Sequence, residues 1–225
     1  METSIKLSSE IEEALKSFNI PDMPSFLSTM ENFRLFLTEE NEKYNLTRLT
    51  GPDEFWIKHV IDSLYAVKFF PELKNAPLKV ADIGSGAGFP SIVLASAFPT
   101  LKLTAVESSH KKTDFMRRAT GILKLKNMAV ATARAREISA KQEWRNSFEV
   151  ITARAVSSCW EIFCETRPML KKNGKYIFYK TPRQAETELC EIRNLSKVSG
   201  FKWDCTENFS LPLDMGERTF IYSHY

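Results

Sequence analysis

The stretch Val80-Ala81-Asp82-Ile83-Gly84-Ser85-Gly86-Ala87-Gly88-Phe89-Pro90 decides the fold of this chain. Its first four residues are typical of a short buried strand, its three glycines of a tight turn, and its proline suits the first position of a helix. Glycines let the backbone turn sharply and let a ligand approach where a side chain would collide. The stretch therefore predicts a strand, a ligand-binding loop and a helix, in that order.

Three side chains indicate which nucleotide-like ligand the loop holds. Phe89 stands where a dinucleotide fingerprint has its third glycine, which disfavours NAD. Asp82 would repel a pyrophosphate, but it could receive the amino-acid end of S-adenosylmethionine, directly or through water. Glu107 ends the next strand, where an acidic side chain commonly accepts hydrogen bonds from both ribose hydroxyls. We therefore expect S-adenosylmethionine as the cofactor, bound by these residues together with Gly84 and Gly86.

From Lys79 onward, short apolar strands alternate with helices, a pattern typical of a parallel sheet covered on both faces. A helix over residues 183–199 is expected to close at Gly200. The expected class is α/β, with a mostly parallel seven-stranded sheet whose last strand could be antiparallel. The expected strands cover residues 79–83, 102–107, 128–133, 148–153, 175–180, 201–209 and 218–225.

The residues before this sheet read as helices. The first helix is expected to start at a capping box of Ser9 and Glu12, and the second to end before the polar run that begins at Asn41. The chain thus divides into an N-terminal helical segment, residues 1–74, packed on an S-adenosylmethionine-binding core, residues 75–225.

Composition excludes several classes of protein. The chain has 225 residues, 43% hydrophobic and 26% charged, and no apolar stretch approaches the roughly 20 residues that cross a bilayer. The amino terminus lacks a secretory signal pattern, so we expect a cytoplasmic protein with no membrane association. The four cysteines form no Cys-x-x-Cys pair, which argues against zinc and favours reduced, mostly buried thiols. We expect no metal site, and a net charge of +3 neither requires nor excludes nucleic acid.

Several motifs are spread along most of the chain: Asn45-Leu46-Thr47, His59 with Asp62-Ser63-Leu64, the loop from Asp82 to Pro90, Glu107-Ser108 with Lys111-Lys112, Thr152-Ala153-Arg154-Ala155-Val156, Lys180 and Arg218. Together they resemble one family, the bacterial 16S rRNA guanine-N7 methyltransferases called RsmG or GidB. The resemblance implies a class I Rossmann-like methyltransferase fold and methylation of guanine 527 in the decoding-region loop of 16S rRNA.

Carried over residue by residue, the resemblance implies that Gly84 and Phe89 line the cofactor site, Arg136 and Glu137 flank the adenine, and Arg154 completes the pocket. The chain departs from the family pattern at two places. Arg134-Ala135-Arg136-Glu137 contains a second arginine where the family has Arg-Ala-Glu, and Thr181-Pro182 follows Lys180 where a glycine is usual. These departures affect the adenine contact and the wall near the target base.

The type of methyl acceptor follows from the residues at the end of the fourth strand. Methyl transfer from a sulfonium is an in-line displacement that mainly requires positioning. Guanine N7 has a free lone pair and needs no general base, whereas an exocyclic amine calls for an Asn/Asp-Pro-Pro-Tyr type of loop. Thr152-Ala153-Arg154-Ala155 stands there instead, and Cys159 lies too far on to be the nucleophile of a pyrimidine C5 methyltransferase. Methylation of a ring nitrogen is the easiest chemistry left, and we assign no catalytic residue.

The expected partner is 16S rRNA or the small ribosomal subunit, bound by a monomer. For any one basic residue, simple solvation is about as plausible as an RNA contact, and His59 could equally be a packing residue. Two other functions stay open: a catalytically silent RNA-binding module on the same fold, and a methyltransferase that acts on another substrate. The candidate RNA-binding residues are Asn45, His59, Lys111, Lys180 and Arg218.

Overall fold

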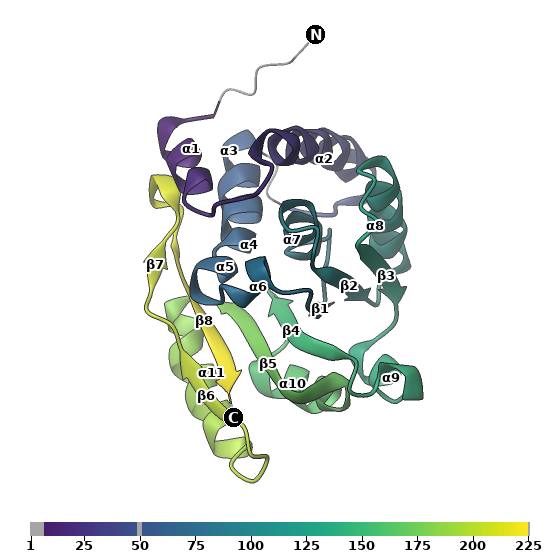
Figure 1. Cartoon of the computed structure of the whole chain (residues 1–225), viewed down its shortest axis with the longest axis vertical. Helices are drawn as coiled ribbons and strands as arrows, with labels where there is room; N and C mark the ends of the chain where they lie inside the picture. Colours follow the sequence, from purple (N-terminus) through teal and green to yellow (C-terminus); the bar gives the residue numbers. More distant parts are fainter. Residues whose placement is uncertain (1–6, 49–50, 225) are drawn as a thin grey trace.

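The computed structural model describes residues 7–48 and 51–224. Within them a single sheet lies between two layers of helices (Figure 1). Seven strands follow the order β3-β2-β1-β4-β5-β8-β6, and the two-residue strand β7 pairs with β8 beside this path. The strands are β1 (Lys79–Ile83), β2 (Lys102–Glu107), β3 (Met128–Thr132), β4 (Phe148–Arg154), β5 (Leu170–Lys180), β6 (Lys202–Cys205), β7 (Phe209–Ser210) and β8 (Glu217–His224).

The strands from β3 to β5 run parallel, whereas β8 is antiparallel to both β5 and β6. The expected α/β class and its mostly parallel sheet are therefore confirmed. Strand order reverses at β1, which pairs with β2 on one side and β4 on the other. Ligands of open α/β sheets bind at the carboxyl ends of the strands at such a reversal. The loop after β1 lies at this point.

The expected strand over residues 201–209 is wrong, because it is broken into β6 and β7. The break begins at Thr206, whose hydroxyl accepts the N–H of Phe220 at 3.0 Å, so that a side chain replaces the backbone in the ladder. The last strand begins at Glu217, and Tyr225, where it was expected to end, lies outside the described residues.

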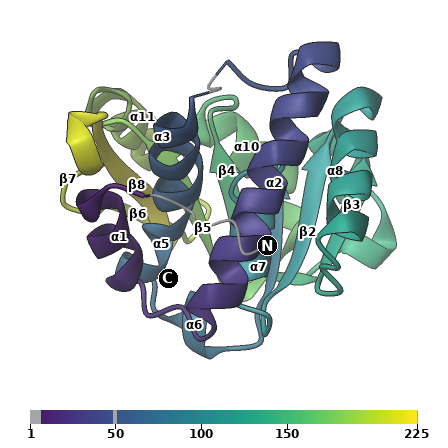
Figure 2. The same ribbon diagram turned by 90° about the horizontal axis from the view of Figure 1, so that it is seen from above.

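Helices α2, α7 and α8 cover one face of the sheet, and α9, α10 and α11 cover the other (Figures 1 and 2). The helices before the first strand are α1 (Ser9–Lys16), α2 (Met23–Tyr44), α3 (Pro52–Glu54), the π-helix η1 (Phe55–Ile61), α4 (Asp62–Leu64), α5 (Ala66–Phe69) and α6 (Glu72–Asn75). Those that follow are α7 (Ser91–Ala97), α8 (His110–Ile122), α9 (Ala135–Ser139), α10 (Cys159–Thr166) and α11 (Pro182–Leu195), with short 3-10 turns η2 (Gln142–Trp144), η3 (Arg167–Met169) and η4 (Pro212–Asp214).

Three helix ends differ from the expected ones. Ser8, not Ser9, caps α1, because its hydroxyl accepts the N–H of Ile11. Helix α2 continues through the polar run to Tyr44, since its charged residues form ion pairs one turn apart, and it stops at Asn45, whose φ is 50°. Helix α11 stops at Leu195, four residues before the expected end.

The N-terminal helices share one hydrophobic cluster with the sheet. That cluster runs from Ile11 in α1 to Phe220 in β8 and includes the glycine loop through Phe89. Phe33 of α2 contacts Phe89 with ring centroids 5.4 Å apart, so these helices pack directly on the loop. Within residues 7–48 and 51–224, none of the helices has the length and apolarity that crossing a membrane requires.

Candidate active site

All three glycines of the loop between β1 and α7 have a positive φ, and two of them, Gly84 and Gly86, differ in what surrounds them. Gly84 has a φ of +70° and Gly86 a φ of +59°, conformations that other residues rarely adopt. A Cβ atom at Gly84 would lie 2.1 Å from Cγ1 of Val156, whereas a Cβ at Gly86 would have no neighbour closer than 4.0 Å. Gly84 is thus required by backbone conformation and by packing, and Gly86 by conformation alone.

Asp82 lies fully buried behind this loop. Its Oδ2 accepts the hydroxyl of Ser91 at 2.6 Å and its Oδ1 that of Thr152 at 2.9 Å, so one carboxyl group joins β1 to α7 and β4. Burial raises the pKa of Asp82 to about 6, although these hydrogen bonds and the charge of Arg154 oppose the rise. Each oxygen already has a partner, and the contact between Asp82 and a cofactor, direct or through water, stays a prediction.

Glu107 stands at the carboxyl end of β2, facing the loop. Its Oε2 accepts the backbone N–H of Gly86 at 3.1 Å, and its Oε1 accepts that of Ser109 at 2.9 Å. These bonds fix the side chain, which is 9% exposed. A carboxylate has about four acceptor positions, so two are left for hydroxyl groups of a ligand.

A cavity of about 290 Å³ opens beside Glu107. The residues that line it fit S-adenosylmethionine, because they offer a glycine without a side chain, a fixed carboxylate that could accept from ribose hydroxyls, and apolar side chains that could pack on the adenine. The lining residues come from the ends of β1 and β2, the start of α9, the segment after β4, and α10: Ile83, Gly84, Val106, Glu107, Ser108, Ala133, Arg134, Ala135, Val156, Ser157, Ile162 and Glu165.

The start of α9 presents different residues to the cavity from those that the family resemblance implies. Arg134 and Ala135 line the cavity, whereas Arg136 and Glu137 are exposed and do not. The carboxylate of Glu137 instead accepts the backbone N–H of Arg134 at 3.3 Å and closes the first turn of the helix. The structure therefore brings Arg134, and not Arg136, to this cavity, and the contact of Arg136 and Glu137 with the adenine stays a prediction.

A second group of charges lies at the same edge of the sheet, and we call it the carboxylate–arginine cluster: Asp62, Arg154 and Arg218. Arg154 Nη1 lies 3.1 Å from Asp62 Oδ2, and Arg218 Nε lies 3.3 Å from Asp62 Oδ1. Arg154 also donates to the carbonyl oxygen of Lys58 and lies over the ring of Phe89, 5.4 Å from its centroid. The cluster joins the N-terminal helices to β4 and β8. Arg154 does not line the 290 Å³ cavity.

His59 is buried between this cluster and the glycine loop. Its ring stacks on Phe89 with centroids 4.0 Å apart, and burial together with Arg154 lowers its pKa to about 3. A guanidinium only donates, so Nδ1, which lies 3.4 Å from Arg154 Nη2, is the acceptor, and Nε2 carries the proton, 3.2 Å from Thr47 Oγ1. His59 is therefore a neutral imidazole, fixed by its contacts with Phe89, Arg154 and Thr47.

Three of the other residues expected to bind RNA, Lys180, Lys111 and Asn45, lie on different elements. Lys180 is 7% exposed and pairs with Glu188 of α11 at 2.8 Å, so its charge is already balanced. Lys111 is exposed on α8 and lies over the ring of Tyr44, and Asn45 is exposed at the end of α2. Any RNA contact of these residues stays a prediction.

Asp62 and Arg134 are the main residues that the sequence reasoning did not place in the site. Ser63, four residues after His59, donates its hydroxyl to the carbonyl oxygen of His59. An acid in an otherwise apolar helical face was the available signal for Asp62. For Arg134, the available signal was the extra arginine in the segment Arg134-Ala135-Arg136-Glu137.

Comparison with known proteins identifies the family of the chain. Residues 27–211 match the family described as rRNA small subunit methyltransferase G. The ribosomal RNA small subunit methyltransferases G of Staphylococcus aureus strains JH9 and USA300 are each 36% identical over 208 residues, 92% of this chain and 85% of theirs.

Solved structures share the fold at low sequence identity. An S-adenosylmethionine-dependent methyltransferase from Aquifex aeolicus aligns with a TM-score of 0.57 and 15% identity, over 80% of this chain and 97% of that one. TYW2 of M. jannaschii, solved with AdoMet, aligns with a TM-score of 0.52 and 17% identity, over 72% of this chain and 74% of that one. The chain thus belongs to the rRNA small subunit methyltransferase G family and is an S-adenosylmethionine-dependent methyltransferase that acts on 16S rRNA.

Proposed function

We propose that the atom methylated is N7 of a guanine, and that this guanine is nucleotide 527 of 16S rRNA. In this reaction the N7 lone pair attacks the methyl carbon, the carbon–sulfur bond breaks, and S-adenosylhomocysteine leaves. The base gains a positive charge and loses no proton. An enzyme for this step needs to align its two substrates and exclude water, without a general base.

The observation that carries the proposal is the character of the groups at the carboxyl end of β4. Arg154 stands there, paired with Asp62, where an enzyme acting on an exocyclic amine would place a proton acceptor. His59 is the neighbouring imidazole, but its pKa of about 3 makes it a weak base, and it is 6% exposed. These groups suit an acceptor that has no proton to lose.

The cysteines give no support to the alternative of pyrimidine C5 methylation. Cys159 is buried at the start of α10, and burial raises the pKa of its thiol, so the thiolate that such chemistry needs is disfavoured. The other three are exposed, so the expectation of mostly buried thiols is wrong, and they lie on α10, α11 and β6. None of them lines the described cavity beside Glu107.

The proposal is tested by mass analysis of 16S rRNA from a strain whose gene for this protein has been deleted. The expected result is loss of one 7-methylguanosine and its return when the wild-type gene is restored. Restoring Gly84→Asp, which places a charged side chain against Val156, is expected not to return it. An unchanged 7-methylguanosine content in the deletion strain would contradict the proposal.

We further propose that the enzyme works as a monomer in the cytoplasm. Six large apolar side chains are exposed among the described residues, and they are spread over several elements, among them Leu35 on α2, Ile122 on α8 and Leu213 in η4. Light scattering after gel filtration is expected to give a mass near 25.8 kDa. A dimer mass would contradict this part of the proposal.

A further inference from the structure

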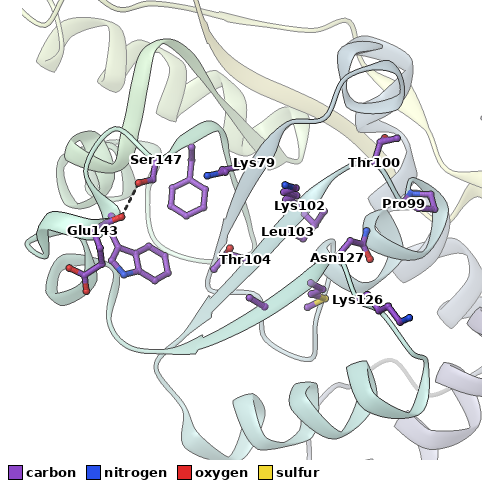
Figure 3. A pocket seen from close by; sticks show the side chains of 14 residues that line it. Lys79, Pro99, Thr100, Lys102, Leu103, Thr104, Lys126, Asn127, Glu143 and Ser147 are labelled. Carbon is purple, nitrogen blue, oxygen red and sulfur yellow. Dashed lines mark hydrogen bonds between the residues drawn. The ribbon is translucent and has the colours of Figure 1, made fainter.

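A large cleft lies at the opposite edge of the sheet from the cofactor site. It has a volume of about 700 Å³ and is formed at the amino ends of β1, β2, β3 and β4 (Figure 3). Its floor is the sheet face that α9 and α10 partly cover, where Thr104 of β2 lies beside Ala129 of β3. Because α9 has only five residues, this part of the face is left open.

Three lysines line the cleft: Lys79, Lys102 and Lys126 (Figure 3). Lys79 and Lys102 are register partners on β1 and β2, so two like charges stand side by side, an arrangement that is destabilising without a counter-charge. Among the ion pairs of the described residues, none includes any of the three. Glu143 is the one acid among the described residues that line the cleft, and it lies at the far wall, where its carbonyl oxygen accepts the hydroxyl of Ser147.

Aromatic rings form one wall of the cleft. Trp144 of η2 is half-buried and packs against Phe148 of β4 with centroids 5.6 Å apart. The short 3-10 turn η2 holds Trp144 at the cleft rather than in the core. A ring face beside lysines is the combination that binds a nucleotide of a single strand, the base by stacking and the phosphate by charge.

We propose that this cleft binds a single-stranded nucleotide segment of the rRNA substrate, with phosphates on Lys79, Lys102 and Lys126 and a base on Trp144. This proposal rests on the assignment of 16S rRNA as substrate. Strand β2 leads from Lys102 in the cleft to Glu107 at the cofactor cavity, and at about 3.3 Å per residue the two ends lie roughly 17 Å apart. A few extended nucleotides span that distance, so one RNA segment is long enough to extend from the cleft to the edge of the sheet that carries the cofactor cavity.

The double variant Lys79→Ala/Lys102→Ala tests the role of the lysines. We expect its affinity for a fluorescently labelled single-stranded fragment of 16S rRNA to fall about 10- to 30-fold at roughly 0.1 M salt. The slope of log affinity against log salt is expected to become less negative by about 1.4, since each contact with a single strand contributes about 0.7. The matched control is Lys197→Ala/Lys202→Ala, which removes the same charge from exposed lysines at the other end of the molecule.

Trp144 is tested separately from charge. Trp144→Ala is expected to lose about tenfold in RNA affinity, and Trp144→Phe, which keeps a ring for stacking, is expected to recover most of it. The dissociation constant for S-adenosylmethionine is expected to be unchanged in all these variants, because the cofactor cavity is formed by other residues. With small ribosomal subunits as substrate, KM is expected to rise while kcat stays the same.

Equal RNA affinity and equal salt slope in the lysine variant and its control would overturn the proposal. Competition with guanosine monophosphate distinguishes a free nucleotide from RNA: if the mononucleotide binds the cleft and RNA binding does not depend on the lysines, the RNA assignment is wrong. Failure of wild-type enzyme to methylate small subunits would instead count against the proposed function, since RNA binding is measured without methyl transfer.

Discussion

The glycine loop and the carboxylate–arginine cluster lie at the same edge of the sheet but are built in different ways. The loop is fixed by backbone features: the positive φ values of Gly84 and Gly86, and the hydrogen bond that the N–H of Gly86 donates to the carboxylate of Glu107. The cluster is fixed by side chains from distant parts of the chain that share the carboxylate of Asp62. Damage to the loop should therefore reduce ligand binding, whereas damage to the cluster should reduce stability as well.

The largest effect is expected from Asp62→Ala, which would leave two guanidinium groups without their shared partner. Removing one side of a buried ion pair costs about 3–5 kcal/mol, and Asp62 is 4% exposed. Urea unfolding measures this loss, with Asp53→Ala as the control at an exposed acid nearby. Arg154→Ala is expected to lower the free energy of unfolding by a comparable amount and to reduce turnover. Equal stability of the Asp62 and Asp53 variants would show that the cluster is not structural.

Gly84→Ala should reduce cofactor affinity more than Gly86→Ala does. Both carry strain of about 1–2 kcal/mol from a left-handed conformation, and the Gly84 variant adds about 1–3 kcal/mol from the contact with Val156. Calorimetry with S-adenosylmethionine gives both affinities. The double variant Gly84→Ala/Val156→Ala is expected to regain the part of the cofactor affinity that the contact with Val156 removes. If the double variant binds the cofactor as weakly as Gly84→Ala alone, this explanation is wrong.

Glu107→Ala sharpens the contrast between ligand binding and stability. A hydrogen bond to a charged group contributes about 1.5–3 kcal/mol, so cofactor affinity should fall about 10- to 100-fold. In Glu107→Gln, which keeps an acceptor for the N–H of Gly86, cofactor affinity should fall less. The control is Glu186→Gln at an exposed position of α11. Cofactor affinity in Glu107→Ala that matches this control would remove Glu107 from the site.

The smallest expected effect, taken per pH unit, is on the pH dependence of stability. The pKa of His59 is about 3 in the folded protein and near 6.5 in the unfolded chain. Its contribution to the free energy of unfolding is therefore present above pH 6.5 and lost as pH falls toward 3. The pKa of Asp82 is raised to about 6, so its contribution acts in the opposite sense, present below its ordinary value of 3.8 and lost as pH rises through 6. Below pH 6.5, His59→Gln should reduce the slope of the free energy of unfolding against pH by up to about 1.4 kcal/mol per pH unit. His110→Gln, at an exposed histidine, is the control, and an equal slope in both would contradict the buried, neutral state of His59.

The same contrast explains how much the sequence alone could predict. The loop and Glu107 are local features of a strand, a turn and the end of the next strand, so residue spacing was enough to place them. The pairing of Asp62 with Arg154 and Arg218 depends on how helices before the sheet pack on β4 and β8, which no local pattern encodes. Lys180 shows the same limit, because its place at a strand end follows from the sequence, whereas its ion pair with Glu188 depends on tertiary packing, and its RNA contact stays a prediction.

The central claim is that this edge of the sheet transfers a methyl group from S-adenosylmethionine to guanine N7. The most direct measurement supplies the purified enzyme with methyl-labelled S-adenosylmethionine and small ribosomal subunits from the deletion strain, and then locates the label on 16S rRNA. We predict a single labelled nucleoside, 7-methylguanosine, with wild-type enzyme and none with Gly84→Asp. Label on another atom or another base, or no transfer by wild-type enzyme, would contradict the account.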